Sequence, residues 1–314
     1  MENTLREPSM VGFAQASAGV CQCPMCHSRA TRAKFVKVYA EERWTLRHCR
    51  NCGLHFTDPV PSAEFLARCY AGDYHEGLRT DGGTEHHLGA KYQRYVNRIA
   101  QHLPPGSRVL DVGCSTGLLV KMLCDQGYRA EGIELNPASA AWGRQHYGIT
   151  IHERAIEQGA FASDSFDAII LADVLEHTLH PRDCLRAIGQ SLRPDGLALV
   201  TFPDVTSLES RWFFLMSKMT STSWLWKNCH IPLHIWEFTP RTAVACFEGA
   251  GFRLIDLQRS QDVPEEDLTG LLKLISFPSR VVAWPAVARR WGTQMEFLIR
   301  RNGSSSHGND LTVS

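Results

Sequence analysis

An alternation of strand-forming and helix-forming segments from Arg108 onward constrains the fold of this chain most strongly. A buried strand that begins at Arg108 turns through glycines into helical apolar spacing over 118–125. Further strands are expected at 128–134, 149–152, 166–172 and 197–202, helices from 137 to near 148 and over 181–192, and a turn at 194–196. This alternation predicts a parallel sheet with helices on both faces, an α/β, Rossmann-like fold.

The turn after the first of these strands has the composition of a nucleotide-binding loop. Gly113 and Gly117 let the backbone approach a ligand closely, and the helix that follows offers unpaired N–H groups. Glu134 ends the next strand about twenty residues later, where a carboxylate can accept hydrogen bonds from both ribose hydroxyls. A nicotinamide-dependent oxidoreductase is the alternative, but Ser115 breaks the Gly-x-Gly-x-x-Gly fingerprint of that class.

Two Cys-x-x-Cys pairs near the N-terminus indicate a metal site. The pairs are Cys23 with Cys26 and Cys49 with Cys52. Two short strand-like runs lie between them and predict a hairpin around Glu41 and Glu42. Four thiolates complete a tetrahedral site with no position for water, which indicates structural Zn²⁺. Cys21 could replace Cys23, and a single pair could be a redox pair, but two pairs favour a zinc ribbon over 21–58.

Charge and cysteine content limit the classes of partner and compartment. The chain has 33 basic and 33 acidic residues, so an extended nucleic-acid surface is not expected. No window approaches the roughly 18 apolar residues of a membrane span, and residues 1–20 lack the features of a secretory signal. We therefore expect a cytoplasmic protein whose 11 cysteines serve as metal ligands and buried thiols.

Taken together, the motifs resemble the class I S-adenosylmethionine-dependent methyltransferases, especially a bacterial branch in which a zinc ribbon precedes the catalytic domain. The motifs that carry the resemblance are 110–117, 132–136, 166–177 and 192–196. The resemblance implies a seven-stranded sheet with an antiparallel last strand over 293–300, and S-adenosyl-L-methionine as cofactor.

The resemblance also implies roles for ten residues. The loop residues Asp111, Gly113, Cys114 and Gly117 would hold the methionine end of the cofactor, and Glu134 and Leu135 would contact the ribose and the adenine. Ala155 and Ile156 would flank the adenine ring, and Asp173 and Val174 would lie beside the sulfonium.

A segment rich in aromatic residues, 204–238, lies between the fifth strand and the next helix. We expect it to form a lid whose aromatic side chains line an acceptor pocket, or seal the lid against the core or the second subunit of a homodimer. His234 and His230 in this segment, and His177 after the fourth strand, are candidate catalytic bases that would remove a proton from the acceptor. Local packing is the alternative role for His177.

The expected organisation follows from these segments. It comprises a disordered N-terminus (1–20), the zinc ribbon (21–58), a helical cap or linker (59–103), the methyltransferase domain (104–302) with its lid insertion (204–238), and a disordered tail (303–314). The expected function is methyl transfer to an oxygen, or a carbon, of a small-molecule acceptor such as a sugar, a glycolipid precursor or a secondary metabolite. The alternative is methylation of a macromolecule, RNA or protein, recruited through the ribbon.

Overall fold

The structure of the chain is a computed structural model that describes residues 21–71, 83–158, 161–220, 230–261 and 292–302. The two ends expected to be disordered, 1–20 and 303–314, lie outside the described residues. Within the described ranges, no helix combines the length and apolarity that crossing a bilayer requires.

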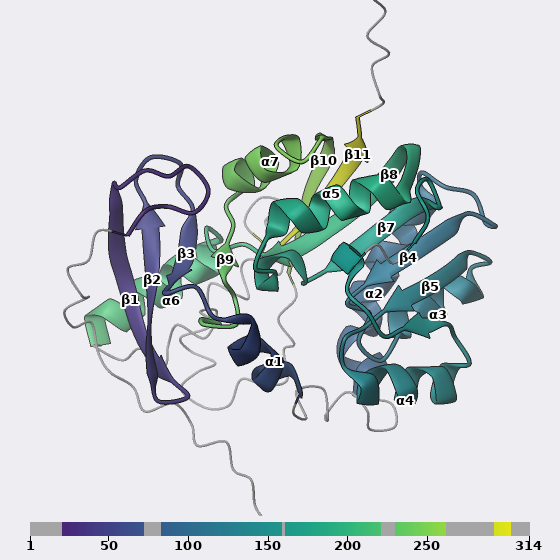
Figure 1. Cartoon of the computed structure of the whole chain (residues 1–314), viewed down its shortest axis with the longest axis horizontal. Helices are drawn as coiled ribbons and strands as arrows, with labels where there is room; N and C mark the ends of the chain where they lie inside the picture. The colour runs from purple at the N-terminus through teal and green to yellow at the C-terminus, as the bar shows by residue number, and fades with distance from the viewer. Residues whose placement is uncertain (1–20, 72–82, 159–160, 221–229, 262–291, 303–314) are drawn as a thin grey trace, which may run out of the picture.

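A seven-stranded sheet forms the centre of the larger part of the molecule (Figure 1), and its strand order is β10-β11-β8-β7-β4-β5-β6. The strands are β4 (Arg108–Val112), β5 (Arg129–Ile133), β6 (Ile151–His152), β7 (Phe166–Ala172), β8 (Leu192–Pro203), β10 (Phe252–Ser260) and β11 (Gln294–Arg301). The strands from β6 to β8 pair in parallel, and β11 runs antiparallel to both β8 and β10. The expected fold class is therefore confirmed, including the antiparallel last strand.

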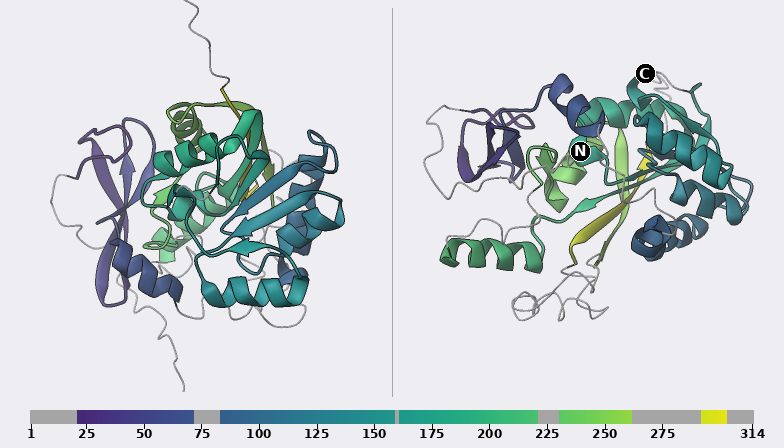
Figure 2. Two further views of the ribbon diagram at one scale, coloured as in Figure 1. Left: turned by 45° about the vertical axis from the view of Figure 1, so that its right-hand side comes forward. Right: turned by 90° about the horizontal axis from the view of Figure 1, so that it is seen from below.

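Helices cover both faces of this sheet (Figure 2). They are α2 (Gly83–Ala100), α3 (Leu118–Asp125) and α4 (Pro137–Tyr147) toward one face, and α5 (Pro181–Ser191) and α7 (Pro240–Glu248) toward the other. Successive residues of β4 show the two cores: Val109 packs in the cluster of α2 and α3, whereas Leu110 packs in the cluster of α5 and α7. Because both faces of the sheet are buried in this way, the strands have continuous apolar sequences.

Strand β8 begins earlier than the sequence suggested. The expected turn at 194–196 lies inside the strand as an irregularity, because β7 pairs with β8 at Phe166 and Leu192 and then shifts register before Ala168. Asp195 has a φ of 62°, which lets the chain bulge at this point without leaving the sheet.

A second, four-stranded sheet contains the N-terminal hairpin and a strand from far along the chain. Its order is β1-β2-β3-β9, with β1 (Thr31–Tyr39), β2 (Glu42–Cys49), β3 (His55–Asp58) and β9 (Trp236–Glu237). Ala40 and Glu41 both have positive φ, 50° and 65°, as a tight two-residue hairpin turn requires. Figure 1 shows β9 beside β3, so the segment expected to be a lid extends the sheet of the ribbon.

Two further helices connect these sheets. Helix α1 (Ala63–Ala71) follows the ribbon, and α6 (Leu208–Thr220) follows β8. The hydrophobic core is shared, because Phe56 of β3 and Phe65 of α1 belong to the same buried cluster as Val200 of β8. The ribbon is therefore packed onto the larger sheet and is not a separate appendage.

Helix α4 packs so closely on the glycine loop that one of its positions tolerates no side chain. A Cβ on Gly143 would meet the backbone carbonyl oxygen of Thr116. We therefore expect Gly143→Ala to lower the free energy of unfolding by about 1–3 kcal/mol, as overpacking does. The matched control is Gly89→Ala in helix α2, where a Cβ meets nothing within 4 Å and alanine should raise stability by roughly 0.5–1 kcal/mol. Urea unfolding compares the two, and equal effects would contradict the close packing.

Candidate active site and metal centre

The loops that carry the expected cofactor residues meet at one edge of the large sheet. Strand β4 lies between β5 and β7, and β5 lies beside β6, all in parallel. The carboxyl ends of β4, β5, β6 and β7 lead into Gly113, Glu134, Ala155 and Asp173, respectively. In open α/β sheets ligands bind in the crevice outside these ends, so the structure brings the expected residues to the place where a nucleotide would bind.

The glycine loop is shaped by positive φ angles and by a close neighbour. Gly113 and Gly117 have φ values of 70° and 81°, which favour glycine. A Cβ on Gly113 would lie 2.7 Å from Cγ2 of Val174. Two of the expected cofactor residues, Gly113 and Val174, are therefore in contact, and this close packing is possible only because Gly113 has no side chain.

The carboxylate of Glu134 organises this edge. Its Oε2 accepts a hydrogen bond from the Ser115 amide (2.9 Å), and its Oε1 accepts one from the Asn136 amide (2.7 Å). Each carboxylate oxygen has further acceptor capacity. The side chain is thereby held in one orientation, in which it can accept two neighbouring hydroxyl groups of a ribose.

A second carboxyl group, Asp111, suits a positively charged ligand. Asp111 is 3% exposed, and burial, together with the charge of Glu134, raises the pKa of this carboxyl well above its usual value. A cation in the crevice would relieve both effects. The ammonium and sulfonium groups of S-adenosylmethionine are such cations, so the residues present fit this cofactor.

The remaining expected cofactor residues differ in exposure. Leu135 is 68% exposed at the crevice edge, as a residue available to stack on adenine would be. The Cys114 thiol instead packs against Gly132 in a small buried cluster, and the Ile156 side chain lies in the main core. Cys114 would therefore meet a cofactor only through its backbone.

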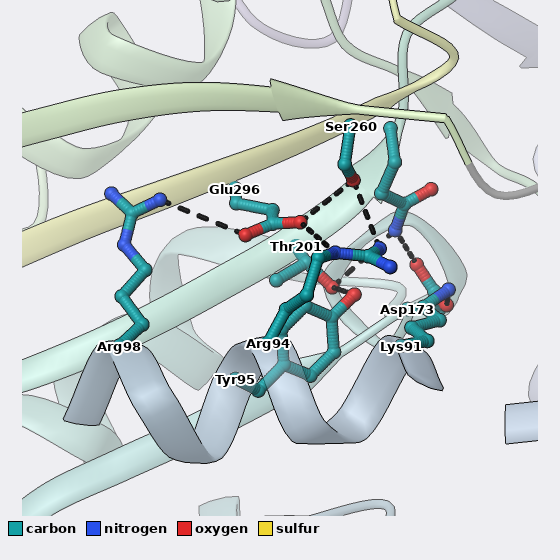
Figure 3. Close-up of polar contacts among 9 residues, drawn as sticks. Lys91, Arg94, Tyr95, Arg98, Asp173, Thr201, Ser260 and Glu296 are labelled. Carbon is teal, nitrogen blue, oxygen red and sulfur yellow. Dashed lines mark hydrogen bonds and ion pairs between the residues drawn. The ribbon is translucent and has the colours of Figure 1, made fainter. Parts of the chain in front are cut away.

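Asp173, which follows β7, is held by two groups from other elements (Figure 3). Its Oδ2 pairs with Nζ of Lys91 at 2.6 Å, and its Oδ1 accepts a hydrogen bond from Nε2 of Gln294. Burial alone would raise the pKa of Asp173, but the Lys91 ammonium and the Gln294 amide outweigh it and lower the pKa. The carboxylate is therefore charged, and it lies beside the position expected for the sulfonium.

Polar contacts fix helix α2 on the sheet along its length (Figure 3). The Tyr95 hydroxyl donates to Oγ1 of Thr201 (3.1 Å), and Arg98 pairs with Asp256 at 2.9 Å. Arg94 donates to Oγ of Ser260 at 3.0 Å. Lys91 is thus the first of four polar residues, with Arg94, Tyr95 and Arg98, that lie on one side of α2 and anchor it on the sheet.

Removal of the Lys91 charge should destabilise the protein at neutral pH. Lys91→Met leaves the Asp173 carboxylate without its cation, although the Gln294 hydrogen bond remains, at a cost of about 1 kcal/mol once its partial exposure is taken into account. Because the folded-state pKa of Asp173 is lowered, its contribution is present at neutral pH and is lost as the pH falls below about 4. Lys121→Met, which breaks the exposed pair with Asp125, is the control and should cost less than about 0.5 kcal/mol. Equal losses for the two variants in urea unfolding would contradict this account.

The three candidate histidines come together although two segments supply them. The rings of His177 and His234 lie 4.6 Å apart, and those of His234 and His230 lie 4.7 Å apart. His234 is 6% exposed, whereas His230 is exposed. Burial lowers the pKa of His234 to about 4, and burial together with His234 lowers that of His177 to about 3. Both imidazoles are therefore neutral at pH 7.

Two buried glutamates and a tyrosine that sequence reasoning missed complete this cluster. Glu176 and Glu237 are 1% and 3% exposed, and burial raises the pKa of Glu237 to about 8. The Tyr70 hydroxyl lies 2.8 Å from Nδ1 of His177. The backbone carbonyl of Tyr70 accepts a hydrogen bond from Nδ2 of Asn136 (3.0 Å), which connects the cluster to the cofactor crevice. Only the spacing of His230, His234 and Glu237 could have suggested part of this arrangement.

The four expected zinc ligands converge at the end of the ribbon. The Sγ atoms of Cys23, Cys26, Cys49 and Cys52 lie within 4.8 Å of one another. Each pair forms a tight turn, since His27 N donates to Cys23 O (2.8 Å) and Gly53 N donates to Cys49 O (3.0 Å). Cys21 is not part of the cluster. The arrangement suits a tetrahedral metal ion with four thiolate ligands.

Comparison with protein families finds one match in the catalytic part of the chain. A family model described as "Methyltransferase domain" matches residues 84–257, more than half of the 314 residues. The match runs from helix α2 to strand β10 and includes the glycine loop, Glu134 and the histidine after β7.

Curated relatives are similar over shorter stretches. The Ubiquinone biosynthesis O-methyltransferase of Stutzerimonas stutzeri is 31% identical over 108 residues, which are 32% of this chain and 47% of the relative. The enzyme of the same name from Methylocella silvestris is 34% identical over 114 residues, 35% of this chain and 43% of the relative. The chain thus spans less than half of the length of these relatives.

Solved structures share the fold at low sequence identity. A chain from the complex between the Haloferax volcanii Trm112 methyltransferase activator and a methyltransferase aligns with a TM-score of 0.55 at 15% identity, covering 74% of this chain and 99% of that one. An S-adenosylmethionine-dependent methyltransferase from Archaeoglobus fulgidus aligns with a TM-score of 0.51 at 15% identity, covering 73% and 100%. Likeness at this identity concerns the fold alone.

Proposed function

The chain belongs to the methyltransferase domain family, and from this premise we propose that it transfers a methyl group from S-adenosylmethionine to an oxygen atom of a small-molecule acceptor. The observation that carries the proposal is the crevice in which Glu134 is oriented by two backbone amides beside the buried carboxyl of Asp111. An acceptor for ribose hydroxyls and a second carboxyl for a cation are the groups that this cofactor requires.

When bound, the cofactor would supply a methyl group on a positively charged sulfur, and an acceptor oxygen held in line with the carbon–sulfur bond could take that methyl group. In the proposed mechanism Asp111 and Glu134 bind and orient the cofactor beside the glycine loop. His177 Nδ1 lies 3.0 Å from Leu233 O, which can only accept a hydrogen bond, and 2.8 Å from the Tyr70 hydroxyl, and we propose the tautomer in which the Nδ1 hydrogen is donated to Leu233 O. Nε2 is then free to accept a hydrogen bond from the acceptor hydroxyl and to orient its lone pair.

The acceptor we propose is a hydroxylated ring compound. Relatives that match the catalytic region act in ubiquinone biosynthesis as O-methyltransferases, and aromatic residues flank the histidine cluster. Trp236 is buried next to it, with Nε1 donating to Thr178 O at 2.6 Å. Apolar walls with a few polar groups are typical of pockets that bind such rings. Trp224 and Trp226, also expected in this pocket, lie outside the described residues.

We further propose that the four cysteines bind one structural Zn²⁺. All four positions are filled by protein, so the ion has no site for water or substrate. Its role would be to stabilise the ribbon, whose strand β3 pairs with β9 and thereby positions His234 two residues before β9. The alternative, that the ribbon recruits RNA or protein, is not favoured, because the β3 edge is already occupied by this chain.

An acceptor screen tests the proposed reaction. The protein would be incubated with S-adenosylmethionine carrying a labelled methyl group and with a panel of catechols, phenols, free sugars and nucleotide-linked sugars. We expect label to be transferred to hydroxylated aromatic rings, with the new methyl group on oxygen. Transfer to sugars alone, or to total RNA or protein in preference to every small molecule, would overturn the proposed acceptor class while leaving the cofactor assignment intact.

A further inference from the structure

We propose that Glu176, His177 and His234 form a second metal site, which binds a divalent first-row transition ion separately from the four cysteines. Each of the three side chains offers one ligand atom, and these atoms all lie within 4.8 Å of one another. An ion with bonds of about 2.0–2.2 Å holds its ligand atoms at most about 4.4 Å apart, so binding would draw the three side chains together wherever their atoms are farther apart than this.

The two segments that supply the ligands are fixed to each other by the backbone. Ile235 N donates to Glu176 O at 2.9 Å, directly beside two of the ligands. On its other side the same segment is fixed to strand β3, where Thr57 Oγ1 donates to His234 O at 2.7 Å and Thr57 N donates to Ile235 O at 2.9 Å. The ligands are therefore held in place before any ion binds.

Unpaired polar atoms in this cluster indicate a missing cation. Glu176 is 1% exposed, and neither of its carboxylate oxygens has a hydrogen-bond partner among the described residues. Nδ1 of His234 and Oε1 of Glu237 lie 3.3 Å apart in poor geometry, and neither makes a hydrogen bond there. A buried polar group without a partner costs about 1–3 kcal/mol, and more if it is charged. A divalent ion would bind the Glu176 carboxylate, the group in this cluster whose burial without a partner costs the most free energy.

The contacts of His177 are those of a metal ligand. Its Nδ1 lies 3.0 Å from Leu233 O, to which an Nδ1 hydrogen can be donated, and 2.8 Å from the Tyr70 hydroxyl, and in that tautomer Nε2 carries a lone pair. Histidines that bind metals almost always donate the other ring N–H to a carbonyl or carboxylate, which fixes the tautomer and the ring orientation. The same pattern occurs here, and none of the described residues makes a hydrogen bond with Nε2.

The ligand types identify the class of ion. Two imidazoles and one carboxylate suit Zn²⁺, Fe²⁺ or Mn²⁺, whereas an all-oxygen set would suit Mg²⁺ or Ca²⁺. Three protein ligands leave open positions, in contrast to the four-cysteine site. If the proposed function is correct, an acceptor hydroxyl would bind the ion at one of these positions in place of its hydrogen bond to His177 Nε2, and the ion would lower its pKa. The metal site itself does not depend on that step.

Titration with Co²⁺ tests the proposal without any assay of activity. Metal-free protein, prepared with a chelator and checked by circular dichroism, would be titrated with Co²⁺, and the bound metal counted by mass spectrometry. We expect two ions per chain, of which one gives thiolate charge-transfer absorption and the other gives only the weaker bands of nitrogen and oxygen ligands. Glu176→Gln and His234→Ala should each lose the second ion and keep the thiolate band, which also reports that the ribbon is folded.

Two further variants complete the experiment. Cys26→Ser should lose the thiolate band, and His152→Ala, which breaks a histidine–glutamate pair with Glu131 elsewhere at the strand ends, should retain both ions. Binding of a single ion by the wild-type protein, lost in Cys26→Ser and unchanged in Glu176→Gln, would overturn the proposal. If one ligand variant fails to fold, the other and the stoichiometry of the wild-type protein still decide the question.

Discussion

Replacement of Glu134 by alanine is expected to weaken the binding of S-adenosylmethionine about hundredfold. Glu134→Ala removes the acceptor of two ribose hydrogen bonds, and hydrogen bonds to a charged group contribute about 1.5–3 kcal/mol each. A loss of about 3 kcal/mol corresponds to a factor of about 100 in the dissociation constant. The same change also removes the acceptor for the amides of Ser115 and Asn136, so the loop is less well ordered for binding. Isothermal titration with S-adenosylmethionine measures the effect.

Glu131→Ala is the matched control for this prediction. Glu131 lies on the same strand, but its carboxylate pairs with Arg108 at 2.9 Å and with His152 at 2.8 Å, away from the loop amides. We expect the affinity of the Glu131→Ala variant for S-adenosylmethionine to stay within about threefold of the wild type. Partly exposed ion pairs such as those of Glu131 contribute less than about 1 kcal/mol. If Glu134→Ala bound the cofactor as tightly as Glu131→Ala, the assignment of the ribose site would be wrong.

Removal of the metal from the cysteine site is expected to unfold the ribbon. Structural zinc contributes on the order of 10 kcal/mol to the folding of small ribbon-like modules. Cys49 is fully buried, so Cys49→Ser should abolish binding of the ion and release the strand pairing of β3 with β9. Because that pairing positions His234, we expect the methyltransferase activity to fall at least tenfold as well. Zinc analysis, hydrogen exchange of residues 31–58 and the acceptor assay measure the three effects.

Cys21→Ser provides the comparison for the zinc experiment. Cys21 lies near the cluster, and its Sγ contacts the backbone oxygen of Gln22, but it is outside the four-cysteine group. The variant should keep about one zinc per chain and normal exchange protection. Loss of zinc in Cys21→Ser would instead make Cys21 a ligand, and its replacement of Cys23 is the alternative that the sequence alone leaves open.

Features set by local sequence were predictable. The order of strands and helices follows from hydrophobic periodicity, and Asn136 and Gly148 mark the ends of α4 as expected, because the Asn136 side chain accepts a hydrogen bond from Ser139 N and Gly148 adopts a φ of 67°. The positions of the glycine loop, Glu134 and Asp173 at one sheet edge follow from parallel strands. The expected membership of the class I methyltransferases is confirmed by the family match and the strand order.

Features that depend on contacts between distant segments were not predictable. Strand β9 is two residues long, and no periodicity in so short a segment indicates that it pairs with β3, about 180 residues earlier in the chain. The roles of Glu176 and Tyr70 were equally hard to predict, since each depends on contacts with residues of another segment. The ten cofactor residues and three histidines remain predictions about function, although the structure places them at two adjoining sites.

The most direct measurement of the central claim is a calorimetric titration of the purified wild-type protein with S-adenosylhomocysteine, the demethylated product, and separately with NADH. Our account predicts binding of S-adenosylhomocysteine at about one molecule per chain with a micromolar dissociation constant, near −8 kcal/mol, and no binding of NADH. Binding of NADH without binding of S-adenosylhomocysteine would contradict the account, because the crevice formed by Gly113 and Glu134 would then belong to a different class of nucleotide enzyme.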